Sequence, residues 1–169
     1  MSQNNTIKVT TGKELYNYQK IAIEEIFQKF DSAVDDYHLL YQLPTGGGKT
    51  VIFSEIVRRY ISKFNKKVLV LTHRIELSKQ TSNMLNEFGV PNKVINSTAK
   101  LDDQDNYDCF VAMVETLKNR LNDDKLDISD IGLVIVDEAH YNSFTKIFKF
   151  YINFVTKQYH KSNHLKRTL

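Results

Sequence analysis

The chain alternates short apolar runs with longer segments of helical periodicity, and this alternation limits the possible folds more than any other feature. Apolar runs typical of buried strands lie at 38–43, 67–72, 93–96, 109–114 and 132–136. Helical spacing of apolar residues is found at 18–30, 52–64, 76–88, 116–121 and 144–155. Strands joined by such helices form right-handed β-α-β units and a parallel sheet. We therefore predict an α/β fold, a doubly wound parallel sheet with helices on both faces, with the strongly β-branched run at 132–136 as a central strand.

Length and composition agree with one globular domain in a reducing compartment. The 169 residues suffice for one domain, which we expect over 13–169 after a flexible, polar segment at 1–12. The single cysteine, Cys109, excludes an internal disulfide framework. No apolar run approaches the roughly 20 residues of a membrane helix, and the N-terminus lacks a signal-peptide pattern. We therefore expect a cytoplasmic protein with no membrane partner.

The segment 43–50, with the sequence LPTGGGKT, has the chemistry of a phosphate-binding loop. Glycine lacks a Cβ, so the backbone amides of a glycine triplet can close around a phosphate, and the following helix start adds its positive dipole end. Lys49 would then meet the β- and γ-phosphates, and the Thr50 hydroxyl would bind Mg²⁺. A plain glycine turn before a basic helix start is the alternative. The candidate nucleotide-binding residues of this segment are Pro44, Thr45, Gly46, Gly47, Gly48, Lys49 and Thr50.

A second motif directly follows the apolar run at 132–136 and supplies acidic groups. Asp137 stands at the expected carboxyl end of a strand, where a carboxylate beside a phosphate loop organises Mg²⁺. Asp137 and Thr50 are therefore the expected metal ligands. The adjacent Glu138 is suited to orient and deprotonate an attacking water. An acidic strand end that caps a helix is the alternative for this motif alone.

Together the two motifs resemble those of the first RecA-like domain of a superfamily 2 helicase. Residues 137–140 read DEAH, and the surrounding pattern is similar to type I and type III restriction motor subunits and related DNA repair helicases. The resemblance covers residues 13–155. It implies a RecA-like P-loop NTPase domain that uses ATP and Mg²⁺. It also implies that ATP hydrolysis is coupled to movement on nucleic acid, with DNA favoured over RNA.

The resemblance also implies roles for individual residues of the nucleotide site. Gln19 matches the glutamine that reads the adenine edge, although the family usually has Arg where this chain has Tyr16. An ordinary helix-start residue is the alternative for Gln19. His140 matches the residue that links the nucleotide site to the strand-moving machinery, and taken alone it could equally be a buried imidazole. The catalytic residues implied are Lys49, Asp137, Glu138 and His140.

Nucleic-acid contacts are implied on a separate edge of the domain. There Thr, Arg and a helix start would contact backbone phosphates without reading the base sequence. Arg74 could instead serve as a surface salt-bridge partner. Met113 and Glu115 stand where the family usually has Thr and Gln, and neither side chain favours a phosphate. The candidate nucleic-acid-binding residues are Thr72, His73, Arg74, Gln80 and Thr116.

Helicases of this family continue into a second RecA-like domain that supplies an arginine finger, worth about 10³ to 10⁵ in rate. Here residues 165–169 do not spell the expected Ser/Thr-Ala-Thr motif. The sequence therefore predicts half of a motor that binds ATP, hydrolyses it weakly and is completed by a second RecA-like domain or subunit. A non-catalytic nucleotide- or nucleic-acid-binding module is the alternative. A small-molecule kinase is disfavoured because arginines are few.

Overall fold

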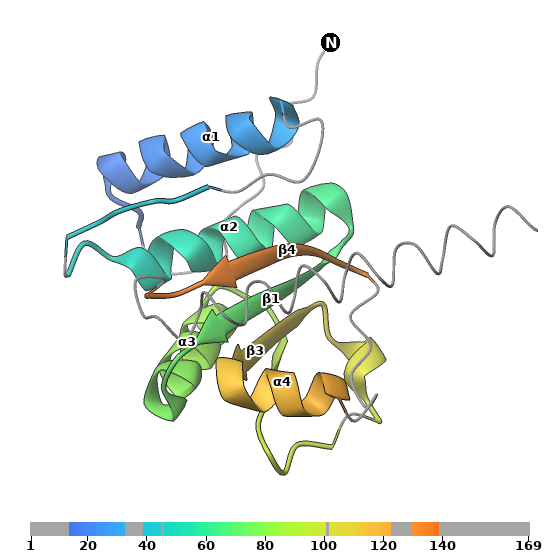
Figure 1. Ribbon diagram of the computed structural model, residues 1–169. Helices are drawn as coiled ribbons and strands as arrows, with labels where there is room; N and C mark the ends of the chain where they lie inside the picture. Colours follow the sequence, from blue (N-terminus) through green and yellow to red (C-terminus); the bar gives the residue numbers. More distant parts are fainter. Residues whose placement is uncertain (1–13, 33–38, 45, 101, 123–129, 139–169) are drawn as a thin grey trace, which may run out of the picture.

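The computed structural model describes residues 14–32, 39–44, 46–100, 102–122 and 130–138, drawn in colour in Figure 1. The elements in these ranges are the helices α1 (Asn17–Ser32), α2 (Lys49–Phe64), α3 (Ile75–Glu87) and α4 (Val114–Asn122), the strands β1 (Lys67–Thr72), β2 (Asn92–Ile95), β3 (Cys109–Met113) and β4 (Ile131–Val136), and the 3₁₀ turn η1 (Gln104–Asn106). They confirm the predicted strands and helices between 52 and 136 within a few residues at each end, and the helix predicted at 18–30. The flexible segment predicted at 1–12, the helix predicted at 144–155, Thr45 and His140 lie outside the described residues.

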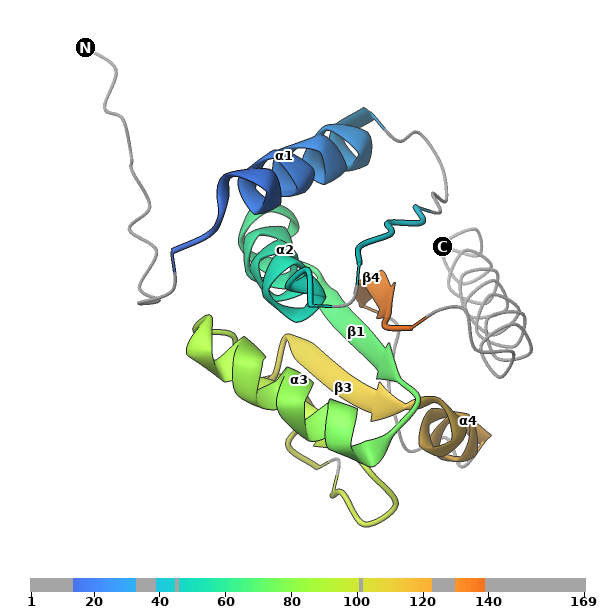
Figure 2. The same cartoon turned by 90° about the vertical axis from the view of Figure 1, so that its left-hand side faces the viewer.

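The four strands form one sheet in the order β2-β3-β1-β4, and every pair is parallel. Val70 of β1 lies opposite Val111 of β3 on one side and Ile135 of β4 on the other. Helices α2 and α3 cover one face of the sheet, and α4 packs against the other, as the two views show (Figures 1 and 2). This arrangement confirms the predicted α/β fold. The carboxyl ends of all four strands consequently meet at one edge.

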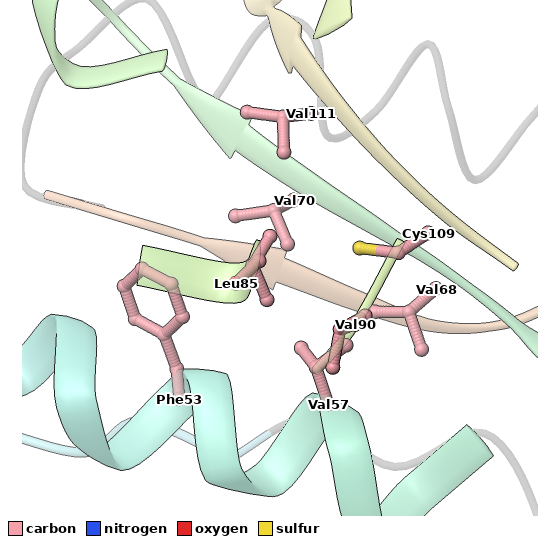
Figure 3. Close-up of a cluster of buried hydrophobic side chains, with 8 residues drawn as sticks. All are labelled: Phe53, Val57, Val68, Val70, Leu85, Val90, Cys109 and Val111. Atoms are coloured by element: carbon pink, nitrogen blue, oxygen red, sulfur yellow. The ribbon is translucent and has the colours of Figure 1, made fainter. Parts of the chain in front are cut away.

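A buried apolar cluster joins α2 and α3 to the sheet (Figure 3). Phe53 and Val57 reach from α2 toward Val68 and Val70 of β1, and every residue of β1 after the first is buried. Burying a side chain of this size stabilises the fold by about 1.5–3 kcal/mol. The same burial raises the pKa of the Cys109 thiol to about 12, because the thiolate would be desolvated, so this thiol is unreactive.

Two predictions about the sheet were wrong. The strand predicted at 38–43 is not formed, because its described part, 39–43, carries no strand, and Leu39, Leu40 and Tyr41 are exposed. Among the described strands, β4 consequently pairs only with β1 and lies at an edge of the sheet rather than at its centre. The β-branched residues of β4 reflect packing on both faces of the sheet instead, since Ile135 lies against the cluster under α2 and Val134 against the cluster that includes α4.

Helix α1 lies on the outer side of α2 and is fixed there by apolar packing and by charge (Figure 1). Ile23, Ile26 and Phe27 of α1 form a buried cluster with the first turns of α2. Arg59 of α2 also bridges to Glu24 of α1 at 2.6 Å. The packing sets the position of the α1 N-terminus, which lies beside the start of α2. Of the helices described, none has the length and apolar character needed to span a bilayer.

Candidate nucleotide-binding site

The glycine triplet forms a turn that leads directly into α2, which begins at Lys49. Gly46 and Gly48 have φ angles of 82° and 72°, in the left-handed region that side chains with a Cβ rarely adopt. The Gly47 amide donates to the Pro44 carbonyl at 3.0 Å and closes the turn. At Gly48 a Cβ would also come within 2.5 Å of Gln19 Nε2. The sequence therefore needs glycine here for both conformation and space, as expected for a loop that wraps a phosphate.

The N-terminus of α1 packs onto this turn through two side chains. The Tyr18 hydroxyl donates to the Gly47 carbonyl at 3.0 Å. Gln19 is 3% exposed, and its Oε1 accepts a hydrogen bond from the Tyr16 amide at 2.9 Å. This bond closes the first turn of α1 in the manner of a capping box. Gln19 thus has the helix-start role left open by the sequence and also lies against the loop, while its contact with adenine stays a prediction.

Lys49 and Glu138 meet at the carboxyl edge of the sheet, with Nζ and Oε1 2.7 Å apart. This hydrogen bond raises the pKa of Lys49, with Asp137 adding a smaller contribution. Burial and the charge of Glu138 raise the pKa of Asp137, against the opposing effect of Lys49. Both members of the pair are partly exposed, so an incoming phosphate can reach the lysine. The two sequence motifs thus lie together in the structure, where the ammonium group of Lys49 is near the carboxylates of Asp137 and Glu138.

The backbone at the end of β4 aims these carboxylates. The Asp137 amide donates to the Leu71 carbonyl at 2.9 Å and so extends the ladder between β4 and β1 by one residue. Glu138 then turns into the left-handed region with φ 57°. Such a conformation costs a non-glycine residue about 1–2 kcal/mol and is typical of functional turns. The turn directs the Glu138 carboxylate to Lys49.

The oxygen ligands available here suit Mg²⁺ held together with a nucleotide. Thr50 offers a hydroxyl at the start of α2, and Asp137 offers a carboxylate at the end of β4. Among the described residues no group of three His, Cys, Asp or Glu side chains could hold a metal. Mg²⁺ usually keeps several waters and binds through one or two protein oxygens plus substrate phosphates. A sparse hard-oxygen set therefore fits this ion better than it fits a fully protein-ligated metal.

The turn after β1 carries the first group of predicted nucleic-acid residues. Thr72 is fully buried, and its hydroxyl lies 2.6 Å from that of Ser78 and donates to the Arg74 carbonyl at 3.3 Å. It therefore holds the turn together. Arg74 is exposed at the start of α3 and forms no ion pair with another described residue. Gln80 is exposed on the same helix.

The remaining predicted residues divide between two places. His73 lies close enough to Asp137 for its charge to lower the pKa of that carboxyl, so it stands between the nucleotide site and the turn. Thr116 is partly buried in the first turn of α4. Thr72 lies opposite Met113 in the β1–β3 register, so the starts of α3 and α4 share one edge of the sheet. The sequence predicted these residues on an edge separate from the nucleotide site, but β1, β3 and β4 are parallel and end at the same edge of the sheet. Nothing in the sequence pointed to the contact of Tyr18 with Gly47.

Comparisons with known proteins show which families and folds this chain resembles. A protein family described as type III restriction enzyme, res subunit, matches residues 12–166. IRC3 of Saccharomyces cerevisiae, assigned as an ATP-dependent helicase, is 35% identical over 143 residues, which is 79% of this chain and 20% of IRC3. The Hef helicase domain of Pyrococcus furiosus superposes with a TM-score of 0.67 at 23% identity, over 83% of this chain and 30% of that one.

A restriction enzyme has the same fold. The type ISP restriction-modification enzyme LlaGI, solved in complex with a DNA substrate mimic, superposes with a TM-score of 0.60 at 22% identity, over 79% of this chain and 16% of LlaGI. The chain spans about a fifth of the length of the curated relatives it matches. Its fold is that of the RecA-like domains of superfamily 2 helicases. The chain belongs to the family of the type III restriction enzyme res subunit, as a helicase-type ATP-binding domain.

Proposed function

We propose that this chain binds ATP with Mg²⁺ and hydrolyses it as the first RecA-like half of a translocase that moves on nucleic acid, with DNA as the favoured track. The observation that carries this proposal is the pairing of Lys49 with Glu138 at 2.7 Å, beside Asp137 and the glycine turn. Family membership supports ATP-dependent helicase chemistry. The nucleic-acid substrate and the slow hydrolysis are what the resemblance to superfamily 2 helicases implies, since those helicases complete the site with a second RecA-like domain.

The residues divide the reaction between them. The amides of the glycine turn and the α2 start receive the phosphates, and Lys49 exchanges Glu138 for the β- and γ-phosphate oxygens. Glu138, released from the lysine, is then placed to orient a water and take its proton as that water attacks the γ-phosphorus. The bond from the γ-phosphorus to the bridging oxygen breaks, and ADP leaves with the electron pair on its β-phosphate. Thr50 and Asp137 would hold Mg²⁺, which would neutralise charge on the phosphates. His140 links this site to the moving parts in our proposal.

The nucleic acid lies across the starts of α3 and α4 in this proposal. Arg74 is exposed at the start of α3 and carries a permanent positive charge suited to backbone phosphates. Gln80 and Thr116 contribute polar groups nearby, and Thr72 holds the turn in shape. Contacts of this kind bind the sugar–phosphate backbone without reading sequence, as translocation requires. LlaGI, solved with a DNA substrate mimic, supports DNA as the ligand class.

A second RecA-like domain or subunit completes the site in this account, because the phosphoryl transition state needs a further cation. Steady-state ATP hydrolysis by the 169-residue chain, with single-stranded DNA, single-stranded RNA or neither, tests the proposal. We expect measurable ATP binding and slow turnover that DNA stimulates more than RNA. If the 169-residue chain alone unwinds duplex DNA, the proposal that a second domain or subunit completes the site is wrong. If the chain does not bind ATP, the whole proposal is wrong.

The alternative is a module that holds nucleotide or nucleic acid without useful turnover. Met113 and Glu115 favour it, since the first is apolar and the second is an exposed acid at the edge where phosphates would bind. If this alternative is correct, the chain binds ATP but does not hydrolyse it under any condition, including the presence of DNA.

A further inference from the structure

Two buried hydroxyls lie under the turn that follows β1. Thr72 is 0% exposed and Ser78 is 1% exposed, and their side-chain oxygens are 2.6 Å apart. Each of these oxygens also lies 3.3 Å from the Arg74 carbonyl oxygen. A hydroxyl has one hydrogen, so one of the two donates to its partner while the other donates to this carbonyl. The pair therefore fixes the backbone of Arg74 from inside the domain, where neither hydroxyl can meet a nucleic acid.

The same turn is tied to the end of β4 on its other side. The Asp137 amide donates to the carbonyl of Leu71, next to the buried pair, at 2.9 Å. The charge of His73 lowers the pKa of Asp137, so the middle of the turn lies near that carboxylate. The short segment 71–74 thus joins the exposed Arg74 to the acidic end of β4.

We propose that Thr72 and Ser78 are positioning residues that couple nucleic acid bound at Arg74 to the nucleotide site through Asp137. The inference rests on the proposed function, because it requires nucleic acid at one end of the segment and nucleotide with Mg²⁺ at the other. It gives Ser78 a role in the reaction, and it replaces the phosphate contact expected for Thr72 with a role inside the domain. A phosphate that binds Arg74 orders the turn, and the turn orders the carboxylate.

Stability alone does not call for this hydroxyl pair. Two buried hydroxyls have lost their contact with water, and apolar side chains of the same shape can replace both partners of such a bond at little cost. The hydroxyls add a fixed geometry instead, since a buried polar network whose members are all paired makes its surroundings rigid. A rigid turn transmits a displacement of Arg74 to the neighbouring strand end, whereas a loose turn absorbs it.

The test measures the thermodynamic coupling between the two ligands. Calorimetry gives the affinity for a non-hydrolysable ATP analogue with Mg²⁺, in the absence and in the presence of saturating single-stranded DNA. Fluorescence anisotropy gives the affinity for the DNA with and without the analogue. The two ratios must agree, because coupling between two sites is reciprocal. For the wild type we expect a coupling factor of about 5 or more.

The variant that tests the pair combines Thr72→Val with Ser78→Ala, which removes both hydroxyls and leaves neither unpaired. We expect its coupling factor to fall below about 2, while the affinity for the analogue without DNA stays within about twofold of the wild type. The slope of log DNA affinity against log salt should not change, because Arg74 is retained. Thr72→Ser is the matched control, since it keeps the hydroxyl and should keep the wild-type coupling.

Thermal melts check that each variant folds, and Ser78→Ala alone breaks the same pair if the double variant does not fold. Three results would overturn the inference and leave the proposed function intact. The first is a wild type that binds both ligands without coupling, and the second is wild-type coupling in the variants that lack the pair. The third is loss of coupling in Thr72→Ser, which would assign the effect to the methyl group. If the wild type binds no ATP analogue or no nucleic acid, the proposed function fails together with the inference.

Discussion

Lys49 and Glu138 are 89 positions apart in the sequence, yet their side chains form an ion pair of 2.7 Å. One residue opens α2 and the other lies in the turn directly after β4, so the pair exists only when the parallel sheet and its covering helix are both in place. The pair neutralises the lysine until phosphate oxygens replace the carboxylate. In the proposed function, the pair therefore links the arrival of nucleotide to the release of Glu138, the proposed catalytic base.

Removing the lysine should remove nucleotide affinity. We expect Lys49→Ala to weaken binding of ATP by about 10- to 100-fold, since a hydrogen bond to a charged group is worth about 1.5–3 kcal/mol. Lys63→Ala is the matched control, because Lys63 lies on the same helix and pairs only with the exposed Asp31 among the described residues. Calorimetry on both variants checks the prediction, and equal affinities in the two variants would refute it.

Gly48 should tolerate no side chain, for two independent reasons. Gly48→Ala would strain a backbone at φ 72° and push Gln19 away from Tyr16, which opens the cap of α1. We expect a loss of about 2–3 kcal/mol in the free energy of unfolding, measured with urea. Gly46→Ala has a similar φ of 82° but no atom within 4 Å of the added carbon, so it should cost only about 1 kcal/mol. Equal losses would show that the contact with Gln19 does not matter.

A buried carboxylate on α2 should make the fold sensitive to acid. Glu55 is 0% exposed; burial would raise its pKa, but hydrogen bonds from Arg58 and Arg59 outweigh burial and lower the pKa. A lowered pKa gives stability that is present above the ordinary value of 4.5 and lost as the pH falls through the lowered pKa. Glu55→Gln should reduce the free energy of unfolding at neutral pH by about 3 kcal/mol.

The control for this site is Glu24→Gln, which removes the exposed partner of Arg59 on α1. Because Glu24 is 62% exposed, we expect a cost below about 1 kcal/mol. Urea unfolding across pH 3 to 7 should also show a weaker acid dependence in Glu55→Gln than in the wild type. An unchanged pH profile would contradict the role given to the buried carboxylate.

Arg74 should contribute a backbone-phosphate contact. Arg74→Ala is expected to weaken binding of single-stranded DNA and to reduce the slope of log affinity against log salt by about 0.7, the value for one phosphate on a single strand. Lys29→Ala, which removes an exposed charge on α1, should leave the slope unchanged. Fluorescence anisotropy at several salt concentrations measures both. A slope unaffected by Arg74→Ala would place the nucleic acid elsewhere.

Much of the fold was predictable because its elements have clear periodicity. The run at 67–72 predicted β1, and the spacing of apolar residues at 52–64 predicted α2. Both motifs were expected at strand ends, and this predicted that they would meet, although the strand expected before Lys49 is not formed and Lys49 instead opens α2. The strand predicted at 38–43 was wrong, because an apolar run indicates that a segment can be buried but does not specify a neighbouring strand with which it pairs.

The contacts that hold the site together could not be predicted from sequence patterns. Tyr18 and Gly47 lie 29 positions apart, and a single tyrosine near a helix start has no pattern that names its partner. From the sequence, Glu55 would be expected to face solvent on an amphipathic helix. In the structure it is buried and accepts hydrogen bonds from Arg58 and Arg59. Such contacts depend on how helices sit on the sheet, which periodicity does not specify.

The central claim is that Glu138 is the catalytic base of an ATP site. The direct measurement compares ATP affinity and steady-state turnover of Glu138→Gln with those of the wild type, with DNA present, and uses Glu25→Gln on the exposed face of α1 as the control. The account predicts that Glu138→Gln binds ATP at least as tightly, because Lys49 loses its competing partner, while turnover falls about 10²- to 10⁴-fold. Turnover by Glu138→Gln equal to that of the wild type would contradict it.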